Sequence, residues 1–335
     1  MNKPVTIKDI AKALNLHHAT VSRALRDHPA INPETRKKIQ GIAREMGYTR
    51  NTLAAALSSR KSRTLAVMVP DIQPWFFASF ISSVSTLAEQ AGYTVMIFQS
   101  NDALKTEQQN TRAIIQNRVA GLIVSVTSET DHYEHFEQVR QQGIPVVFFD
   151  RVPRDLPGRK IMIDNYRGAF TATEYLINRG RRNIAFIAAP RDVSIFYERL
   201  QGYQSALEQN GFAHYPDRTI HADLSISGGK MAAQQLLSVP DTPDAILCTV
   251  DLQAFGAMRV IHDLALKIPT DIALIGFDDH PAGEIVFPTL TTVAQPIAGI
   301  AGAAFECVMQ AIENPGADHQ NPAPLPMELI CRNSA

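Results

Sequence analysis

The chain has 335 residues, of which 45% are hydrophobic, so it is long enough for two or three domains and is not an intrinsically disordered protein. Its net charge of -1 hides an asymmetry, because residues 1–64 contain thirteen Lys and Arg against four Asp and Glu, and the remainder contains nineteen against twenty-nine. A basic arm on an acidic body suggests contact with a polyanion, most simply nucleic acid. A basic surface that serves only solubility is the alternative.

The N-terminal stretch "MNKPVTIKDIAKAL" has neither the long apolar segment nor the cleavage pattern of a signal peptide, and no apolar run approaches the roughly 20 residues of a membrane helix. The three cysteines, Cys248, Cys307 and Cys331, are too scattered for a disulfide framework or a CxxC metal site. We therefore expect a cytoplasmic protein with inert cysteines.

The basic arm predicts three short helices. A capping-box pattern starts the first helix at Thr6, and the second runs from about His17 to Arg26. The third begins with Asn32 as its N-cap and stops at Gly47. A tight turn between the first two helices makes this a helix-turn-helix, a motif whose second helix lies in the DNA major groove.

The exposed face of the second helix carries the candidate DNA contacts. Arg23 suits a bidentate contact with guanine, whereas Ser22 and Thr20 can donate hydrogen bonds to phosphates. His18 and Ala19 should lie closest to the base edges. Adjacent histidines on a helix point about 100° apart, so we do not expect the histidine pair to share a metal ion.

The segments "VTIKDIAKALNLHHATVSRAL", "INPETRKKIQGIAREMGY" and "NTLAAAL" resemble the DNA-binding headpiece of the lactose-repressor/galactose-repressor family of bacterial transcription regulators. In that family the two residues before T-V-S-R read the bases, which implies this role for His18 and Ala19. His17 stands where a small hydroxyl N-cap is common, so the sequence departs from the family pattern there. We expect His17 at the start of the helix, near the sugar-phosphate backbone.

"NTLAAAL" resembles the hinge helix of that family, which forms on the operator. The resemblance implies that Leu57 is an apolar wedge in a minor-groove base step and that Ala54 packs close to the groove floor. An ordinary linker leucine is the alternative for Leu57, and the basic residues of "SSRKSR" are equally consistent with phosphate contact and with a solvated linker. The DNA contacts that we assign are Thr6, His17, His18, Ala19, Thr20, Ser22, Arg23, Asn32, Asn51, Ala54 and Leu57.

From Thr64 onward, short apolar runs alternate with helical patterns. The runs are "TLAVMVP", "YTVMIFQS", "AGLIVSV", "IPVVFFD", "NIAFIAAP", "DAILCTV" and "DIALIGFDD". Strands separated by amphipathic helices predict parallel sheets covered on both faces, and the pattern repeats after about residue 163. The expected fold class is α/β: a three-helix helix-turn-helix headpiece and a periplasmic-binding-protein-like core of two doubly wound subdomains.

We place the boundaries as follows. Residues 1–49 form the headpiece and residues 50–63 the hinge helix and linker. Residues 64–162 form the N-subdomain of the core and residues 163–290 its C-subdomain. Residues 291–335 form a crossover segment that returns to the N-subdomain and a C-terminal tail.

Ligands of doubly wound folds bind where the strands end, and here the strand ends are polar or aromatic. By resemblance to the same family, the motifs "FFDR", "ERLQGY", "IGFDD" and "TVAQP" place effector contacts in a cleft between the subdomains. The predicted effector contacts are Gln73, Trp75, Phe76, Phe77, Asp150, Arg151, Arg199, Asp278 and Gln295. Aromatic faces with carboxylate and guanidinium groups suit a small polar ligand such as a sugar.

Each of these residues has a plainer alternative. Asp150 and Arg151 could be a local surface ion pair, Arg199 could only hold a helix, Asp278 could cap a strand end, and either phenylalanine could belong to the core. Two further positions depart from the family pattern. Val250 replaces a polar residue before Asp251, and Leu224 replaces an aromatic residue. Asp251 itself is expected to brace the start of the adjoining helix.

No GxSxG, GxGxxG, GxxxxGK[ST] or HExxH motif is present, so we expect no enzyme, no cofactor and no metal. The headpiece and the missing signal peptide argue against a periplasmic binding protein. We therefore predict a DNA-binding transcription regulator, expected to be a repressor, that binds operator DNA as a homodimer, with a tetramer left open. A small polar effector in the cleft, a sugar or sugar derivative, would control it. Control by a protein partner or a nucleoside is the alternative.

Overall fold

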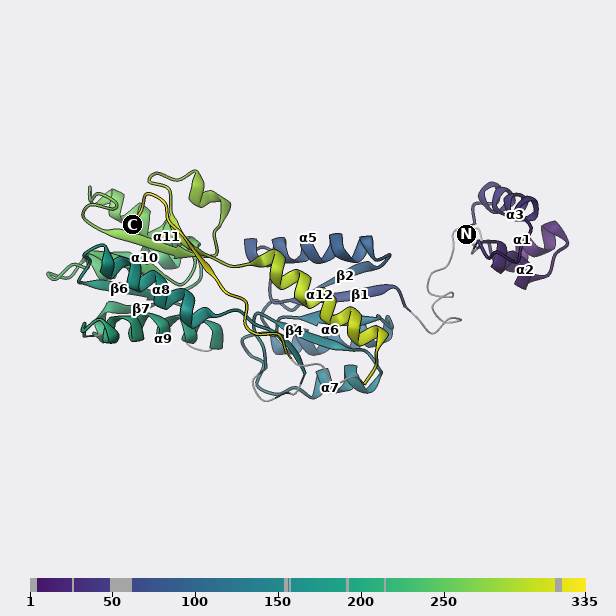
Figure 1. The fold of residues 1–335 in the computed structure, drawn as a ribbon, viewed down its shortest axis with the longest axis horizontal. Helices are drawn as coiled ribbons and strands as arrows, with labels where there is room; N and C mark the ends of the chain where they lie inside the picture. The colour runs from purple at the N-terminus through teal and green to yellow at the C-terminus, as the bar shows by residue number, and fades with distance from the viewer. Residues whose placement is uncertain are drawn as a thin grey trace. The chain divides into compact units, whose positions relative to one another are not determined.

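The computed structural model describes residues 5–25, 27–48, 62–153, 156, 158–190, 193–213, 215–316 and 321–335 (Figure 1). The chain divides into two compact units: residues 1–62, which include the headpiece, and residues 63–335, which we call the core. The predicted hinge contacts Asn51, Ala54 and Leu57 lie outside the described residues.

The headpiece contains three helices, as the sequence predicts: α1 (Ile7–Leu14), α2 (His18–Ala24) and α3 (Pro33–Glu45). One side chain from each helix is fully buried at their common centre, namely Ile10, Val21 and Ile39. Ile10 and Val21 flank the turn between α1 and α2, so their burial fixes the angle of the helix-turn-helix.

Side-chain caps begin all three helices of the headpiece. Thr6 and Asp9 make the predicted capping box, and the Asn32 side chain accepts a hydrogen bond from the Glu34 backbone N–H at 2.9 Å. The second helix begins one residue later than predicted, because His17 is its N-cap and accepts a hydrogen bond through Nδ1 from the Ala19 N–H at 3.3 Å. It ends at Ala24, two residues before the predicted end.

The core contains two sheets. The first sheet consists of β1 (Thr64–Val69), β2 (Thr94–Gln99), β3 (Gly121–Val124), β4 (Val146–Phe149) and β5 (Arg159–Ile161) in the spatial order β2-β1-β3-β4-β5, all parallel. Its helices are α5 (Trp75–Gln90), α6 (Leu104–Gln116), α7 (Glu134–Gln141) and α12 (Ile297–Glu313). We call this assembly the N-subdomain.

The second sheet consists of β6 (Ile184–Ala188), β7 (Thr219–His221), β8 (Ala245–Cys248), β9 (Ala273–Phe277), β10 (Thr291–Ala294) and β11 (Glu328–Ile330) in the order β11-β10-β9-β8-β6-β7. The strands are parallel except β11, which is antiparallel to β10. Its elements are α8 (Asn165–Asn178), α9 (Ser194–Gln209), α10 (Ile226–Leu237), α11 (Asp251–Asp263) and the short turns η1 (Pro216–Arg218) and η2 (Pro281–Glu284). We call this assembly the C-subdomain.

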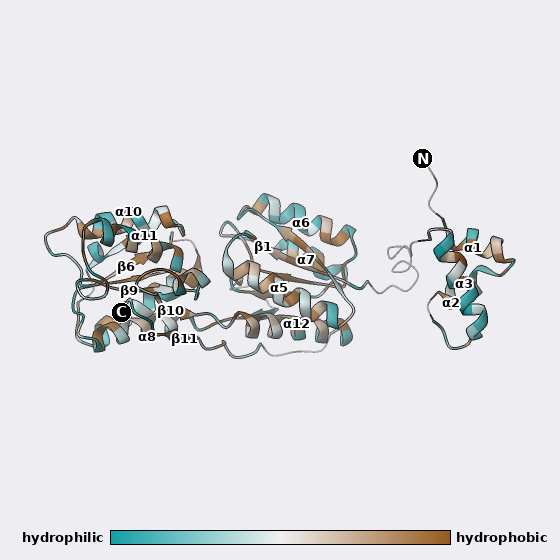
Figure 2. Cartoon of the chain, turned by 90° about the horizontal axis from the view of Figure 1, so that it is seen from above, coloured by the Kyte–Doolittle hydropathy of each residue, from teal (hydrophilic) through white to brown (hydrophobic). Residues whose placement is uncertain are grey.

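Both sheets are covered on both faces, which explains the continuous apolar runs. On one face of the first sheet, α5 and α12 pack on Leu65, Val67 and Val69, and on the other α6 and α7 pack on Ala66 and Met68. In the second sheet α10 and α11 cover one face, and α8 and α9 cover the other. Figure 2 shows the hydrophobic colours concentrated in the strands. All seven predicted strands are present, and the predicted fold class is confirmed.

The chain passes between the two subdomains three times, after β5, after β10 and after α12. Two of these passages are joined by a parallel bridge between Ile163 and Leu325. The segment predicted as a crossover and tail, residues 291–335, therefore contributes β10 and β11 to the second sheet, and α12 alone packs on the first.

Helices α10 and α11 approach each other closely at two glycines. A Cβ atom on Gly229 would lie 2.0 Å from the carbonyl oxygen of Gln253, and one on Gly256 would lie 2.1 Å from the carbonyl oxygen of Ile226. Both neighbours are backbone atoms of the facing helix, so no side-chain rotation can relieve the overlap. Close packing of this helix pair therefore requires glycine at both positions.

We expect Gly229→Ala to lower the free energy of unfolding of the core by about 3 kcal/mol, because the added methyl group forces two packed helices apart. Chemical denaturation followed by circular dichroism measures this change. Gly302→Ala in α12 is the matched control, since no atom lies within 4 Å of its would-be Cβ, and it should stabilise the helix by up to about 1 kcal/mol. Equal effects of the two substitutions would contradict the packing argument.

Candidate functional site

The predicted DNA-reading face is the exposed side of α2. His18 and Arg23 are exposed, whereas Val21 and Ala24 on the opposite side are buried in the headpiece core. Ala19, Thr20 and Ser22 are half-buried and belong to the same short helix. The second helix thus presents the predicted base readers away from the core.

Three of the predicted DNA contacts have structural roles as helix caps. Thr6 donates from Oγ1 to the Asp9 carboxylate at 2.7 Å, and His17 and Asn32 cap α2 and α3. The rings of His17 and His18 are 4.2 Å apart between centroids and tilted by 41°. Because the Nδ1 atom of His17 is committed to the cap, the structure makes His18 the more available of the two rings.

In the core, Asp150 follows β4 in a left-handed conformation with φ 58°. Its carboxylate is buried and accepts a hydrogen bond from Ser125 Oγ at 3.0 Å. Burial raises the pKa of Asp150, and the charges of Arg151 and Arg199 and the Ser125 hydrogen bond partly oppose this shift. Asp150 is therefore a buried polar group and not half of a surface ion pair.

Arg199 lies in α9 with its guanidinium fully buried. The Nε–H donates to Asn165 Oδ1 at 2.9 Å, and Nη1 donates to the Thr249 carbonyl at 2.7 Å. The guanidinium carbon is 3.7 Å from the ring centroid of Phe277, a cation–π arrangement. Arg199 therefore does more than hold its own helix: it joins α8, α9 and the ends of β8 and β9.

Asp278 follows β9 with φ 114°, an unusual value for a residue with a side chain. Its Oδ1 atom lies 3.7 Å from Arg199 Nη1 and accepts a hydrogen bond from Gln295 Nε2 at 2.5 Å. Burial raises the pKa of Asp278 to about 6, although Arg199 and Gln295 oppose the shift. Asp278 is half-buried, and backbone strain at a charged residue with a shifted pKa is a feature of functional sites.

Charges from the two subdomains meet at this place. The charge of Asp150 in the N-subdomain raises the pKa of Asp278 in the C-subdomain, and Arg199 lowers the pKa of Asp150. Gln295 completes the group, and its buried Oε1 atom has no hydrogen-bond partner within the described part of the protein. We call Asp150, Arg199, Asp278 and Gln295 the charged cluster.

Arg151 does not pair with its neighbour Asp150. Its Nη1 atom donates to Asp102 Oδ1 at 2.6 Å, and the backbone N–H and Oγ of Ser128 also bind this carboxylate, each at 2.8 Å. The predicted alternative of a local ion pair is wrong, because the side chain reaches a partner 49 positions away in the sequence. Its guanidinium is already neutralised.

The aromatic cluster after β1 divides into two parts. Phe76 and Phe77 are buried in the N-subdomain core, where Phe77 meets Phe149 edge-on at 6.3 Å, so the core alternative holds for these two residues. Trp75 is 41% exposed, and its ring centroid lies 6.1 Å from that of His280 in the C-subdomain. Gln73 lies on an exposed turn that its backbone N–H closes with Asp71.

Asp251 has a different role from the predicted one. Its carboxylate accepts hydrogen bonds from the His280 backbone N–H and from Thr292 Oγ1, both at 2.7 Å, and so it braces the segment after β9 and not the start of its own helix. Burial raises its pKa well above the usual range. Val250 is the N-cap of α11 and makes no side-chain cap, while Leu224 packs near Phe196.

Sequence reasoning missed His280, Asn165, Thr249 and Ser125, which touch or position the predicted residues. The signal for His280 was present, because it stands two residues after Asp278 at the same strand end. The other three carry no motif, and only the fold brings them to the cluster.

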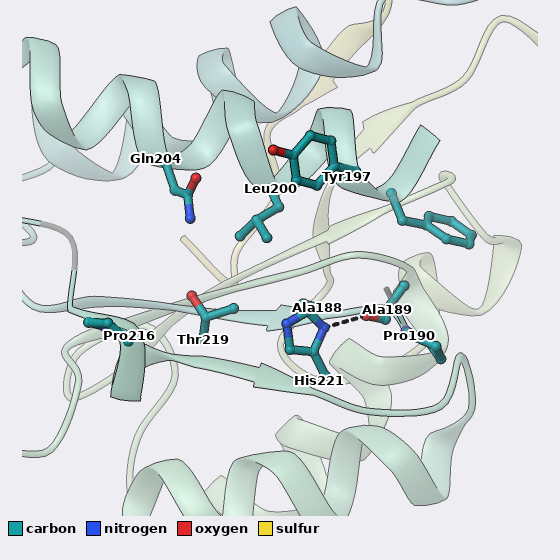
Figure 3. A pocket seen from close by; sticks show the side chains of 10 residues that line it. Ala188, Ala189, Pro190, Tyr197, Leu200, Gln204, Pro216, Thr219 and His221 are labelled. Carbon is teal, nitrogen blue, oxygen red and sulfur yellow. Dashed lines mark hydrogen bonds between the residues drawn. The ribbon is translucent and has the colours of Figure 1, made fainter. Parts of the chain in front are cut away.

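A separate hollow of about 370 Å³ lies in the C-subdomain between α9 and β7 (Figure 3). Tyr197, Leu200 and Gln204 form its upper wall, and Thr219 and His221 form its lower wall. The His221 ring is tied to the Ala189 carbonyl by a 2.6 Å hydrogen bond. None of the predicted effector contacts lines this hollow.

The described ranges contain no group of three or more His, Cys, Asp or Glu side chains placed to hold a metal ion. Within the same ranges, none of the helices has the length and apolar character that a bilayer crossing requires.

Comparison with known proteins covers both units. Residues 6–51 match the family model "Bacterial regulatory proteins, lacI family", and residues 173–335 match a "Periplasmic binding protein-like domain". The HTH-type transcriptional repressor CytR of Escherichia coli (strain K12) is 33% identical over 291 residues, 87% of this chain and 85% of that protein. The ribose operon repressor of Halalkalibacterium halodurans is 30% identical over 98% of this chain and 96% of that protein. These relatives are transcription regulators and not enzymes.

The crystal structure of the Lac repressor dimer bound to operator and the anti-inducer ONPF has the same fold. It superposes with a TM-score of 0.88 at 24% identity and covers 99% of both chains.

The raised pKa of Asp278 predicts that ionisation of this side chain lowers the free energy of unfolding. The folded protein holds this proton up to about pH 6 and the unfolded chain only up to about pH 4, so the contribution of Asp278 to the stability of the wild type should fall by roughly 1–3 kcal/mol as the pH rises between these values. Asp278→Asn cannot ionise, and its stability relative to the wild type should therefore rise as the pH increases through this range. Denaturant titrations at several pH values measure the difference, and a constant or falling difference would contradict the assignment.

Proposed function

The chain belongs to the LacI family of bacterial regulatory proteins and is a DNA-binding transcription regulator, and we propose that it is a repressor whose operator affinity is set by an uncharged, hydroxyl-rich effector, a sugar or sugar derivative. The effector site that we propose is the space beside the charged cluster, between the two subdomains. Because the partner is chromosomal DNA, we expect the protein to act in the cytoplasm.

The observation that carries the effector proposal is the joint construction of the charged cluster. Asp150 comes from the N-subdomain, whereas Arg199, Asp278 and Gln295 come from the C-subdomain. A ligand that bridges Asp150 and Asp278 would hold the two subdomains in one relative position. Since Gln295 Oε1 is a buried acceptor without a partner, a ligand hydroxyl can satisfy it and recover the cost of its desolvation.

The charge of the cluster selects an uncharged ligand. Two carboxylates, Asp150 and Asp278, face one guanidinium, that of Arg199, whose donors already bind Asn165 and Thr249. Arg151, the other nearby cation, is paired with Asp102. Arg151 Nε is a buried donor without a partner among the described residues, yet two carboxylates still face the one guanidinium of Arg199. A phosphate or carboxylate group would therefore meet net negative charge, whereas hydroxyl groups can donate to the carboxylates. The name of the ribose operon repressor, a 30% identical relative, is in keeping with a sugar.

The DNA-binding part of the proposal follows the helix-turn-helix geometry. The exposed face of α2 would enter the major groove, with His18 and Ala19 at the bases and Arg23 on guanine or phosphate. Thr6, His17, Thr20, Ser22 and Asn32 would contact the backbone, and Asn51, Ala54 and Leu57 would form the hinge contact with the minor groove. The residue roles rest on the sequence pattern and on the exposure of the helix.

We further propose that the protein acts as a homodimer. The edge strand β2 exposes the apolar side chains Met96 and Ile97, and Ile285 and Phe287 near η2 are 85% and 98% exposed. Apolar side chains on an open sheet edge and on a loop are expected to be covered by a partner. A second copy of the chain would also supply the second headpiece for a two-fold symmetric operator.

Selection from random-sequence DNA tests the reading role of α2. We expect the wild type to enrich an inverted repeat, and we expect His18→Ala to relax the preference at one symmetry-related pair of bases, with a loss of about 10- to 100-fold in discrimination there. His17→Asn is the control, since asparagine is a good N-cap and should leave the selected sequence unchanged. If His18→Ala selected the wild-type sequence, the assignment would fail.

Matched pairs of ligands test the effector proposal. We expect D-ribose and uridine to outcompete D-ribose 5-phosphate and uridine 5′-monophosphate by at least about tenfold in affinity if either neutral compound binds, because a dianion adds to the two carboxylates. A thermal-shift assay is suitable, since a ligand at about 100 times its Kd stabilises the folded state by about 2.7 kcal/mol. Asp150→Asn should remove the shift. Tighter binding of the phosphorylated member would exclude an uncharged effector.

A further inference from the structure

We propose that His280 is a positioning residue of the effector site: it holds the indole of Trp75 against the C-subdomain, so that this ring forms one wall of the site. This inference rests on the proposed effector site, and its first test needs neither effector nor DNA.

Trp75 is unusual in its surroundings. It is the single tryptophan among 335 residues and the first residue of α5, directly before two phenylalanines that are buried in the N-subdomain core. Its own side chain is not absorbed by that core and remains 41% exposed. A large aromatic ring at this position is therefore available for a contact outside its own subdomain.

The described residues show one such contact. The ring centroids of Trp75 and His280 are 6.1 Å apart with an interplanar angle of 57°, a geometry within the range of favourable aromatic pairs. Among the ring contacts between described residues, this pair alone joins the N-subdomain to the C-subdomain. The pair is too close for a ligand ring to stack between the two rings, so it can only wall the site.

His280 is held in place from three sides. Its backbone N–H donates to the buried Asp251 carboxylate at 2.7 Å, and its Nδ1 atom accepts a hydrogen bond from the Ala282 N–H at 3.1 Å as the N-cap of η2. The ring also meets the edge of Phe255 at 5.7 Å. The position of the imidazole is therefore fixed by its own subdomain, whereas the Trp75 indole, 41% exposed, has a ring contact among the described residues only with His280.

The same segment carries Asp278, one member of the charged cluster. Asp278 donates its backbone N–H to the Val293 carbonyl at 2.9 Å, and the Asp279 carboxylate accepts a hydrogen bond from Arg332 at 2.8 Å. Residues 278–280 thus form a fixed segment, with the proposed ligand-binding carboxylate of Asp278 at one end and the contact of His280 with Trp75 at the other. Because this segment holds Trp75 in place before the ligand arrives, it would lower the entropy cost of ligand binding.

Two complementary substitutions separate the ring of His280 from its capping role. Asparagine keeps an acceptor for the Ala282 N–H but removes the ring, whereas phenylalanine keeps the ring but removes the acceptor. The readout is acrylamide quenching of tryptophan fluorescence in the unliganded protein, because all of the signal comes from Trp75. We expect His280→Asn to raise the quenching constant and His280→Phe to leave it near the wild-type value.

Tyr197→Ala, at an exposed aromatic residue of the C-subdomain, is the control and should not change the quenching. Unfolding midpoints of all variants verify that each is folded. Unchanged quenching in His280→Asn, or equal changes in the asparagine and phenylalanine variants, would overturn the proposal.

A second experiment measures the binding of D-ribose and uridine. For whichever compound binds the wild type, His280→Asn should raise the Kd by about 2- to 12-fold, which corresponds to the stabilisation by one aromatic pair. His280→Phe should restore the wild-type Kd. Raised quenching with an unchanged Kd would overturn the positioning role. If neither compound binds the wild type, D-ribose and uridine are excluded as the effector of the proposed function, and the quenching measurement still decides whether His280 positions Trp75.

Discussion

The buried cation of Arg199 organises the place where the strand ends of the C-subdomain meet. The guanidinium of Arg199 has lost its water, and such a charge is tolerated only where hydrogen bonds and opposite charge replace that water. Asn165 at the start of α8, the Thr249 carbonyl at the end of β8, and Asp278 at the end of β9 supply them. The need to compensate one charge therefore fixes where a helix and two strand ends meet, and it holds Asp278 in its unusual backbone conformation.

The balance of charge around Arg199 also sets the chemistry of the proposed site. With Asp150 across the subdomain boundary, two carboxylates compete for one cation, and burial raises the pKa of both. Hydroxyl donors stabilise such a pair of carboxylates, whereas further negative charge destabilises it. In the function that we propose, the same cluster would set the ligand selectivity and couple the two subdomains, because its members come from both of them.

The sequence was sufficient for the long, regular features. Seven strands with continuous apolar runs, the capping box at Thr6 and the cap at Asn32 were all predicted, since each has a strong local signal. The strands β5, β7, β10 and β11 were not, because three or four residues at or near a sheet edge carry too little periodicity. The partners of Arg151 and Asp251 could not be predicted from a local pattern, because they are distant in the sequence. Asp102 is 49 positions from Arg151, and Thr292 is 41 positions from Asp251.

The path of α12 has a consequence for how the protein is made. This helix covers one face of the first sheet, where Val308 presses so closely on β3 that a Cβ on Gly121 would lie 2.5 Å from it, yet it is synthesised after nearly all of the second sheet. The face of the first sheet that α12 covers therefore cannot be completed when the strands of the N-subdomain leave the ribosome, and it stays open until about 150 further residues have been made, some eight to thirty seconds at ordinary elongation rates. The C-subdomain can acquire most of its sheet first, so the order of folding need not follow the order of the chain.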